Sequence, residues 1–363
     1  MAETMRAIVI PTFGGPEVLS YRTVAKPAPG ADEVLIRVRA FGVNHAEMHM
    51  RKGEWDEWDP ITGLECVGTV EAYPHPTPSS TSSSSLSPEE AVAARRRRLP
   101  VGARVAAVMG GMGRSRPGSY GEYVAVPASN VIALDDTTSL SWEQLAALPE
   151  VYCTAWSCLF TVLDLQKGER LLIRGATSTV GQAALHLAVD AGAVVTATTR
   201  RAERFAWLEE MGAAEAVKEE EGLFSSAKGS GADGEAKEEA ATVRKFDKTL
   251  NLIGNRALLE SIALTRPGGR MLQAGWLGGL QPVEAFNPMV QMQPGVHFSL
   301  FHSKVLGTPA FPLEDVPLGE IVRKLEEGRW DAKPARVFEY TDIVNAHRAL
   351  DSHDVGGKIV VRH

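Results

Sequence analysis

The segment at residues 170–205, RLLIRGATSTVGQAALHLAVDAGAVVTATTRRAERF, constrains the fold more than any other part of the chain. An apolar run, Leu171–Ile173, leads into a turn of small residues between Gly175 and Gly181, and an amphipathic stretch and a second apolar run follow. This order predicts a strand, a tight turn, a helix and a parallel strand. The turn indicates a pyrophosphate site, because helix N-termini attract phosphate. A purely structural turn is the alternative, because the strict G-x-G-x-x-G spacing is absent.

Apolar strands and helix-like segments alternate from about residue 130 to about residue 304. Ser141, with Gln144 three positions later, has the pattern of a helix N-cap. Such alternation, with short turns that contain glycine, predicts a parallel doubly wound sheet. The first 70 residues and the tail after about residue 304 are instead rich in strands and turns. At 363 residues, the chain suits one large domain or two smaller ones.

Two polar segments interrupt these patterns. Residues 74–100 are rich in serine and proline and contain four consecutive arginines, Arg95–Arg98, whereas residues 218–245 are rich in glutamate, glycine and alanine. Neither has apolar periodicity, so we predict disordered surface insertions at about 75–98 and 219–242. We expect the four arginines to lie on a solvated loop, and contact with an anionic partner is the alternative.

Composition excludes several classes of protein. The hydrophobic fraction of 44% is that of a globular protein, and a net charge of −7 gives no reason to expect a nucleic acid or an anionic membrane as partner. No apolar run approaches a spanning helix, and the first residues lack the pattern of a signal peptide, so we expect a cytoplasmic protein. The cysteines, Cys66, Cys153 and Cys158, are too few for a four-cysteine zinc lobe, and we expect buried thiols.

The end of the second strand in the phosphate segment indicates the cofactor. An NAD-binding fold usually has an acidic residue there, which binds the ribose hydroxyls. This chain has Thr199, Arg200 and Arg201, followed by Arg204. Guanidinium groups pair with a 2′-phosphate, so the sequence favours NADPH. A solvated basic cluster at the start of a helix is the alternative.

Taken together, these features resemble the medium-chain dehydrogenase/reductase superfamily and, within it, the zinc-free quinone oxidoreductase branch. The resemblance covers nearly the whole chain outside the two insertions. It is carried by the phosphate turn and by FGGPEVL (13–19), GVNHAEMHMRKGEW (42–55), GLECVGTV (63–70), GSYGEYVAVPASNVIAL (118–134), ALPEVYCTAW (147–156), RPGGRMLQAGWLGG (266–279) and GGKIVV (356–361).

The resemblance implies an α/β fold in which a GroES-like, β-rich catalytic domain carries an inserted Rossmann cofactor domain. The implied limits are residues 1–129 plus 305–363 for the catalytic domain and 130–304 for the NADPH-binding domain. A homodimer is implied as well. The implied cofactor-binding residues are Thr154, Thr177, Ser178, Thr179, Val180, Thr199, Arg200, Arg204, Gly254, Gly275, Trp276 and Lys358.

The resemblance also implies a catalytic pocket without metal, lined by Asn44, His49 and Trp55. Zinc-dependent relatives have a cysteine at the position of Asn44, a histidine at that of Leu64 and a cysteine or acidic residue near Glu150. Catalytic zinc needs three protein ligands, so we expect none here. The branch more often has tyrosines at His49 and Trp55, aspartate at Glu47, and glycines at positions 178 and 179.

We therefore expect an NADPH-dependent reductase that transfers hydride to a quinone or an α,β-unsaturated carbonyl compound, as quinone oxidoreductases and enoyl reductases do. A non-catalytic NADPH-binding or redox-sensing protein is one alternative, and a secondary-alcohol dehydrogenase is another. We expect no nucleic-acid or membrane partner. Histidine side chains are able to exchange a proton near neutral pH, so His49 is either a proton donor or simply part of the pocket wall.

Overall fold

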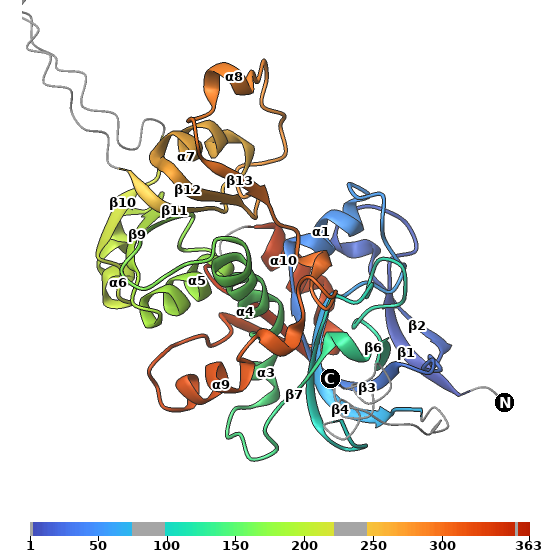
Figure 1. Cartoon of the computed structure of the whole chain (residues 1–363). Helices are drawn as coiled ribbons and strands as arrows, with labels where there is room; N and C mark the ends of the chain where they lie inside the picture. Colours follow the sequence, from blue (N-terminus) through green and yellow to red (C-terminus); the bar gives the residue numbers. More distant parts are fainter. Residues whose placement is uncertain (1–2, 75–98, 221–244, 353–354) are drawn as a thin grey trace, which may run out of the picture. The chain divides into compact units, whose positions relative to one another are not determined.

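The computed structural model describes residues 3–74, 99–220, 245–352 and 355–363 (Figure 1). Both predicted insertions lie outside these ranges, except for Glu219 and Glu220. The chain divides into two compact units, Met1–Thr154 with Ser303–His363, and Ala155–His302. The predicted domain limits at 129/130 and 304/305 stay a prediction.

The first unit is built on an extended, mainly antiparallel sheet. In the described residues its strands follow the order β14-β15-β3-β4-β5-β7, with β6 paired to β3, and β1 and β2 form a separate antiparallel pair. The bounds are β1 (Thr4–Val9), β2 (Ser20–Ala25), β3 (Glu33–Val43), β4 (Glu65–Ala72), β5 (Arg104–Val108), β6 (Tyr123–Pro127), β7 (Val131–Ala133), β14 (Arg336–Glu339) and β15 (Ile359–Arg362). Because β15 pairs with β3, the last strand of the chain completes a sheet that the first part begins.

Helices of this unit follow local signals in the sequence. They are α1 (His45–Lys52), α3 (Trp142–Ala146), α4 (Pro149–Trp156, which continues past Thr154), α9 (Leu318–Glu326) and α10 (Ile343–Asp351), with 3-10 turns at Pro16–Val18, Ala128–Asn130, Ser303–Val305, Leu313–Asp315 and Tyr340–Asp342. The predicted cap of α3 is confirmed: the Ser141 side chain accepts a hydrogen bond from the Gln144 N–H, and the Gln144 side chain accepts one from the Ser141 N–H. This reciprocal pair satisfies two N–H groups at the start of the helix.

The second unit is a parallel sheet with helices on both faces, which confirms the predicted Rossmann architecture. In the described residues the order is β10-β9-β8-β11-β12-β13, with α5 and α6 on one face and α7 on the other (Figure 1). The bounds are β8 (Arg170–Arg174), α5 (Thr179–Asp190), β9 (Val194–Thr199), α6 (Phe205–Glu210), β10 (Glu215–Lys218), β11 (Phe246–Asn251), α7 (Leu258–Leu264), β12 (Thr265–Gln273), α8 (Pro288–Gln291) and β13 (His297–Leu300), with a π-helical stretch at Ser157–Val162 and 3-10 turns at Ala202–Arg204 and Asn255–Ala257. The strand order reverses between β8 and β11, and ligands of such sheets bind beyond the carboxyl ends of the strands at this point.

Apolar side chains of the strands form the cores. In β3, Val34, Ile36 and Val38 are buried, and in β8, Leu171–Ile173 are fully buried. The three cysteines are unpaired and buried, as expected, and burial raises the pKa of the Cys66 and Cys153 thiols. Within the described ranges, no helix is both long enough and apolar enough to cross a bilayer.

Candidate functional site

The turn between β8 and α5 has the structure that its sequence predicts. Ser178 is the N-cap of α5: its hydroxyl accepts a hydrogen bond from the Gly181 N–H at 3.1 Å and donates one to the Gly175 carbonyl at 2.8 Å. Gly175 has a φ of 83°, which favours glycine. A Cβ on Gly181 would lie 2.5 Å from the Gly175 carbonyl oxygen, so only glycine allows this approach of helix and strand.

Four predicted cofactor-binding residues lie together in this turn. Thr177, Ser178, Thr179 and Val180 are all half-buried, at the start of a twelve-residue helix. The N-terminus of such a helix provides N–H groups and a positive partial charge. The turn is therefore able to hold a pyrophosphate, although serine and threonine replace the glycines commonly found at positions 178 and 179.

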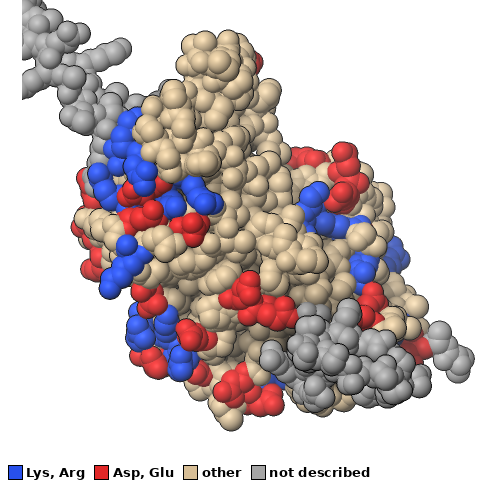
Figure 2. All heavy atoms as spheres, viewed as in Figure 1, with Lys and Arg blue, Asp and Glu red and all other residues tan. Residues whose placement is uncertain are grey.

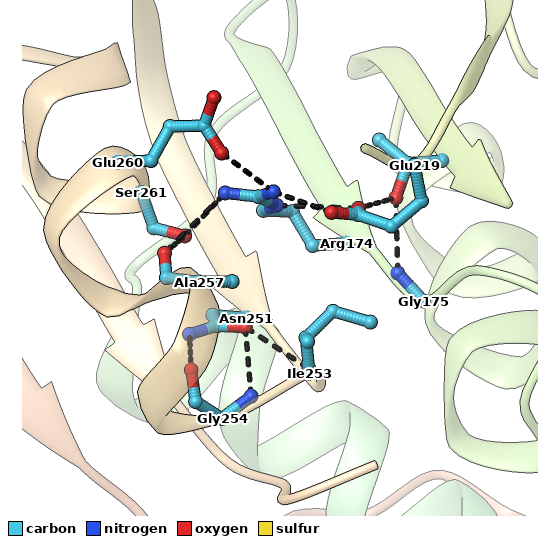
Figure 3. A network of polar contacts seen from close by, with 10 residues as sticks. Arg174, Gly175, Glu219, Asn251, Ile253, Gly254, Ala257, Glu260 and Ser261 are labelled. Atoms are coloured by element: carbon cyan, nitrogen blue, oxygen red, sulfur yellow. Dashed lines mark hydrogen bonds and ion pairs between the residues drawn. The ribbon is translucent and has the colours of Figure 1, made fainter. Parts of the chain in front are cut away.

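The carboxyl ends of β11 and β12 bring together three further predicted residues. Gly254 has a φ of 96°, and a Cβ there would lie 2.9 Å from both the Gly275 carbonyl oxygen and the Trp276 Cα. The Asn251 side chain fixes this loop, since its oxygen accepts hydrogen bonds from the Ile253 and Gly254 N–H groups at 3.0 and 3.1 Å (Figure 3). Backbone therefore packs closely on backbone at the edge where Rossmann sheets bind ligands.

The predicted 2′-phosphate partners stand at the end of β9 and just beyond it. Thr199 is buried, and its hydroxyl lies 3.4 Å from that of Thr177 in the phosphate turn. Arg200 is exposed and forms no hydrogen bond or ion pair with any described residue. The Arg204 guanidinium instead lies over the ring of Trp207, 5.3 Å from its centroid. The two arginines thus differ, because one is exposed and the other is held against an aromatic ring.

A buried ionic network beneath this edge was not predicted from the sequence. We call it the Arg174 network, and its members are Arg174, Thr198, Glu219, Glu260 and Ser261. The Arg174 guanidinium forms two bonds to the Glu219 carboxylate, and it lies 2.8 Å from a Glu260 oxygen (Figure 3). It also donates to the Ser261 hydroxyl and to a backbone carbonyl of the turn that precedes α7, both at 3.3 Å.

This network reaches the phosphate turn through one hydroxyl. The Thr198 hydroxyl donates to the Glu219 carboxylate and accepts a hydrogen bond from the Gly175 N–H at 3.1 Å. The first residue of the turn is therefore fixed by a chain of bonds that ends on a fully buried guanidinium. Glu219 gave no signal in the sequence, because it begins a polar run that reads as a disordered insertion.

A second buried cluster lies in the other unit, around the start of α1. We call it the Lys358 cluster, and its members are Asn44, Glu47, Glu65, Glu150 and Lys358. The Asn44 amide nitrogen donates to Glu47 at 3.2 Å and to Glu65 at 3.1 Å, and the amide oxygen accepts from the Lys358 ammonium. Both amide hydrogens of Asn44 are thus used within the protein. Asn44 is a predicted catalytic residue, and this geometry suits a positioning group.

The remaining contacts of the Lys358 cluster are also short and buried. Lys358 forms an ion pair with Glu65, and its nitrogen lies 4.0 Å from a Glu150 oxygen. Glu65 accepts a hydrogen bond from the Glu150 N–H at 2.8 Å, and Glu47 accepts one from the Leu64 N–H at 3.1 Å. A Cβ on Gly42 would overlap both Glu65 and Lys358, so glycine lets the β3 backbone approach the cluster.

Charge within the Lys358 cluster is unbalanced, because one ammonium faces three carboxyl groups. Burial raises the pKa of Glu47 to about 7, and burial also raises that of Glu150. The Lys358 pKa is raised: burial opposes the charge, but Glu65 and Glu150 outweigh it. The ammonium thus lies beside Asn44 and Glu150, two of the three positions to which the resemblance assigns zinc ligands in metal-dependent relatives.

No metal-binding group is found in the described part of the chain, where no three His, Cys, Asp or Glu side chains converge as ligands. The predicted absence of zinc stays a prediction.

Thr154, a predicted cofactor residue, is buried and donates to Glu150 at 3.3 Å. Lys358 was also predicted to bind cofactor, and its ammonium is buried within the cluster.

The other predicted catalytic residues lie on α1 and just after it. The His49 ring nitrogen Nδ1 pairs with the Glu54 carboxylate. The rings of His49 and Trp55 are nearly parallel, at 6° and a centroid separation of 6.1 Å. The Arg114 guanidinium lies over the Trp55 ring, 4.3 Å from its centroid. A flat aromatic surface of this kind suits a planar ligand, and the roles of these residues stay a prediction.

Comparison with known proteins gives matches in both units. The alcohol dehydrogenase GroES-like domain family matches residues 30–136, and the zinc-binding dehydrogenase family matches residues 179–306. The quinone oxidoreductase of Rattus norvegicus is 28% identical over 304 residues, which cover 82% of this chain and 81% of the rat protein.

Two further matches extend over nearly the whole chain. A phenolphthiocerol/phthiocerol polyketide synthase from Mycobacterium tuberculosis is 25% identical over 95% of this chain, but the match spans only 14% of the synthase polypeptide. The structure of mycobacterial Rv1454c complexed with NADPH has a TM-score of 0.75 at 22% identity, and the match covers 99% of this chain and all of that one. At this identity the structural match shows a shared fold.

Proposed function

We propose that this chain is an NADPH-dependent reductase of quinones or α,β-unsaturated carbonyl compounds. It belongs to the medium-chain dehydrogenase/reductase superfamily and to its quinone-oxidoreductase-like branch. The observation that carries the cofactor assignment is the pairing of a glycine-dependent phosphate turn with an exposed arginine directly after β9. The acceptor class is supported by the residues of the Lys358 cluster.

The residues of the second unit fit a dinucleotide. Gly181 allows α5 to pack closely on β8, and the half-buried residues 177–180 at the start of α5 would hold a pyrophosphate. Arg200, exposed beside the end of β9, would pair with the 2′-phosphate, and Arg204 would add a second positive charge. NADPH, when bound, supplies the hydride. Thr198 and the Arg174 network would keep the turn in place during binding and release.

The proposed class of hydride acceptor depends on which groups of the first unit are able to stabilise the negative charge that develops on the substrate during reduction. Reduction of an isolated ketone creates a localised alkoxide, which metal-dependent enzymes stabilise by Lewis-acid contact. At the three corresponding positions this chain has the Asn44 amide, the Leu64 side chain, which has no ligand atom, and a carboxyl group near an ammonium. Reduction of a conjugated acceptor gives a delocalised enolate or hydroquinone anion, which hydrogen bonds and dipoles alone are able to stabilise.

Within this proposal, the residues near α1 bind and orient the acceptor. Trp55 would provide an apolar platform for a flat substrate. Glu54 fixes the orientation of the His49 ring, which would then donate a proton to the product or act as part of the wall. The Asn44 amide, held at both ends, would keep the start of α1 rigid beside the substrate.

The test of the reaction is a comparison of matched substrates. Initial rates of NADPH oxidation are measured with an enone and its saturated ketone, and the products are identified. We expect the enone to react far faster and to give the saturated ketone. A preference for the saturated ketone, with an alcohol as product, would favour a secondary-alcohol dehydrogenase. Tight NADPH binding with no turnover of enones or quinones would favour the non-catalytic alternative.

The test of the cofactor is a titration of both nicotinamide nucleotides. Charge-assisted hydrogen bonds contribute about 1.5–3 kcal/mol each, so NADPH should bind at least about tenfold more tightly than NADH. The double variant Arg200→Ala, Arg204→Ala should lose this preference, with Arg201→Ala as the matched control in the same basic run. Equal NADPH affinity in the wild type and the double variant would contradict the assignment.

We also propose that the protein is a homodimer that associates through the second unit. The segment around α8 and β13 exposes large apolar side chains, and the surface around α8 has few charged groups on the face drawn in Figure 2. These side chains are Leu277, Leu280, Met289, Val290, Phe298 and Leu300. Exposed apolar patches at a sheet edge commonly mark an interface. Sedimentation of the wild type and of Met289→Glu tests this, and a monomeric wild type would contradict it.

A further inference from the structure

A hollow in the first unit, separate from the Lys358 cluster, is lined by two cations and two carboxylates and adjoins an aromatic ring. It has a volume of about 510 Å³, which is enough for a small organic molecule. We call it the cationic hollow after Arg114 and Lys304, the two cations that line it; its lining also includes the carboxylates of Glu57 and Asp56, with Trp58 and Met109. The Arg114 guanidinium also covers one face of the Trp55 ring, so the hollow adjoins the predicted substrate platform.

The loop that carries Arg114 is held in an unusual backbone conformation. Met109 has a φ of 60°, in the left-handed region that non-glycine residues rarely adopt, and Gly110, Gly111 and Gly113 have φ values of 63°, 85° and 68°. A Cβ on Gly113 would lie 2.9 Å from the Gly63 nitrogen, so the loop packs tightly on the segment before β4. Backbone strain of this kind is concentrated at functional sites.

Arg114 is incompletely paired for a group so well buried. Its side chain is only 14% exposed, and its Nε atom is buried without a hydrogen-bond partner among the described residues. Burial lowers the pKa of the guanidinium, although Glu57 and Glu47 oppose this. Burying a charged group is costly unless it is paired and hydrogen-bonded. A counterion bound in the hollow would remove much of this cost.

The position of such a counterion is indicated by Glu57. One oxygen of its carboxylate, Oε2, lies 3.9 Å from Arg114 and 3.8 Å from Lys304. Both distances are longer than a hydrogen bond, and the Glu57 side chain is 63% exposed. A carboxylate at the position of Glu57 Oε2 therefore faces both Arg114 and Lys304. The Glu57 carboxylate itself forms no hydrogen bond with either cation, so a ligand is able to displace it.

We propose that the cationic hollow binds the carboxylate of an acidic substrate, which displaces Glu57 and pairs with Arg114 and Lys304. The inference rests on the proposed reductase function and narrows its substrate to a conjugated carbonyl compound that carries a carboxylate. The planar tail would extend from the hollow toward Trp55. Arg114 and Lys304 determine specificity in this account, and the hydride acceptor lies elsewhere on the substrate.

The experiment uses the full-length protein with NADPH, and (E)-4-oxopent-2-enoate is compared with its methyl ester. We expect kcat/KM for the acid to exceed that for the ester by about tenfold, mainly through KM, because the ester lacks the charge. Lys304→Gln and Arg114→Gln should each lower the acid-to-ester ratio several-fold, whereas Glu57→Gln should raise it. Lys333→Gln, at an exposed lysine outside the hollow, is the matched control and should leave the ratio as in wild type.

A binding measurement separates this inference from the proposed function. Calorimetric titration with 4-oxopentanoate, which cannot be reduced at a conjugated double bond, should show binding that Lys304→Gln weakens and Glu57→Gln strengthens. Reduction of both enones at equal efficiency, with no change in any variant, would overturn the inference and leave the reductase function standing. Binding with this mutational pattern but no turnover of either enone would support the hollow and overturn the proposed reaction.

Discussion

In the first unit one ammonium, that of Lys358, faces three carboxyl groups, whereas in the second unit one guanidinium, that of Arg174, faces two. Arg174 binds Glu219 with two nitrogens and still reaches Glu260 and Ser261. The five N–H groups of a planar guanidinium allow this, whereas an ammonium has three. The Lys358 ammonium donates to Asn44 and pairs with Glu65, whereas the nearest Glu150 oxygen lies 4.0 Å from its nitrogen.

In both sites the carboxyl groups outnumber the cations, and the two sites differ in how far these carboxyl groups are exposed to water. In the Arg174 network the second carboxylate, Glu260, is 26% exposed, so water shares in its solvation. In the Lys358 cluster Glu47 and Glu65 are fully buried, and burial, with a smaller contribution from the Glu65 charge, raises the pKa of Glu47 to about 7. The Lys358 cluster therefore contains a carboxyl group that exchanges a proton near neutral pH. The predictions below test this contrast.

The largest effect is expected for Lys358→Met, which removes the sole cation of its cluster. Breaking a buried ion pair by removing one partner costs about 3–5 kcal/mol, because the remaining charges are buried without compensation. The loss should be smaller at pH 5 than at pH 8, since protonated carboxyl groups need no counterion. Urea unfolding at both pH values measures it. A loss below about 1 kcal/mol would show that the cluster is already neutral, and a large loss that is the same at both pH values would show that its carboxyl groups do not titrate between them.

The second prediction concerns the pH dependence that Glu47 contributes. Its pKa is raised from 4.5 to about 7 on folding, so its contribution to stability is complete below pH 4.5 and is lost as the pH rises through 7. The full loss is about 3 kcal/mol. Glu47→Gln cannot titrate, so the stability of the wild type relative to the variant should fall by that amount from pH 4.5 to 8. Parallel curves would contradict the raised pKa.

A smaller effect is expected for Arg174→Lys, which keeps the charge of the network and removes the planar fork. The loss of one charged hydrogen bond should lower the free energy of unfolding by about 2 kcal/mol. NADPH affinity should fall as well, because Gly175 is fixed through Thr198 and Glu219. The matched change in the other unit is Lys358→Arg. Unchanged stability in Arg174→Lys would mean that charge alone, without geometry, maintains the network.

The smallest effect is expected for Glu260→Gln. Its carboxylate is partly exposed, and ion pairs accessible to water contribute about 0–1 kcal/mol. The variant should therefore unfold within about 0.5 kcal/mol of the wild type, and its stability should respond little to salt. A loss comparable to that of Arg174→Lys would show that Glu260 is needed to balance the buried guanidinium, and the contrast between the two clusters would weaken.

Local spacing in the sequence predicted much of the second unit and little of these clusters. The turn at residues 175–181 and the cap at Ser141 depend on neighbours a few positions apart, so their patterns are visible in a short window. Arg174 and Glu219 are 45 residues apart, and Lys358 and Asn44 are 314 apart. Such pairs are created by strand order, because β10 lies beside β9 and β15 lies beside β3.

The family resemblance identified some residues of the candidate site, but it did not predict which side chains surround them or how deeply they are buried. It selected Asn44 and Lys358 separately, one as a catalytic residue and the other as a cofactor contact, and the structure joins them by a hydrogen bond. It gave no indication that Glu47 and Glu65 share the same buried space. Burial is a property of packing, and neither motif letters nor spacing record how much water reaches a side chain.

The burial of the cysteines has a consequence if the proposed substrate class is correct. Enones and quinones of the proposed class are alkylating agents, and the thiolate is the nucleophile that they attack. Cys66, Cys153 and Cys158 lie in the interior, and burial raises the pKa of Cys66 and Cys153, so their thiols stay protonated. Burial would thereby protect the folded protein from acceptors of the proposed class. That protection would end on unfolding, when each sulfur meets both water and the electrophile.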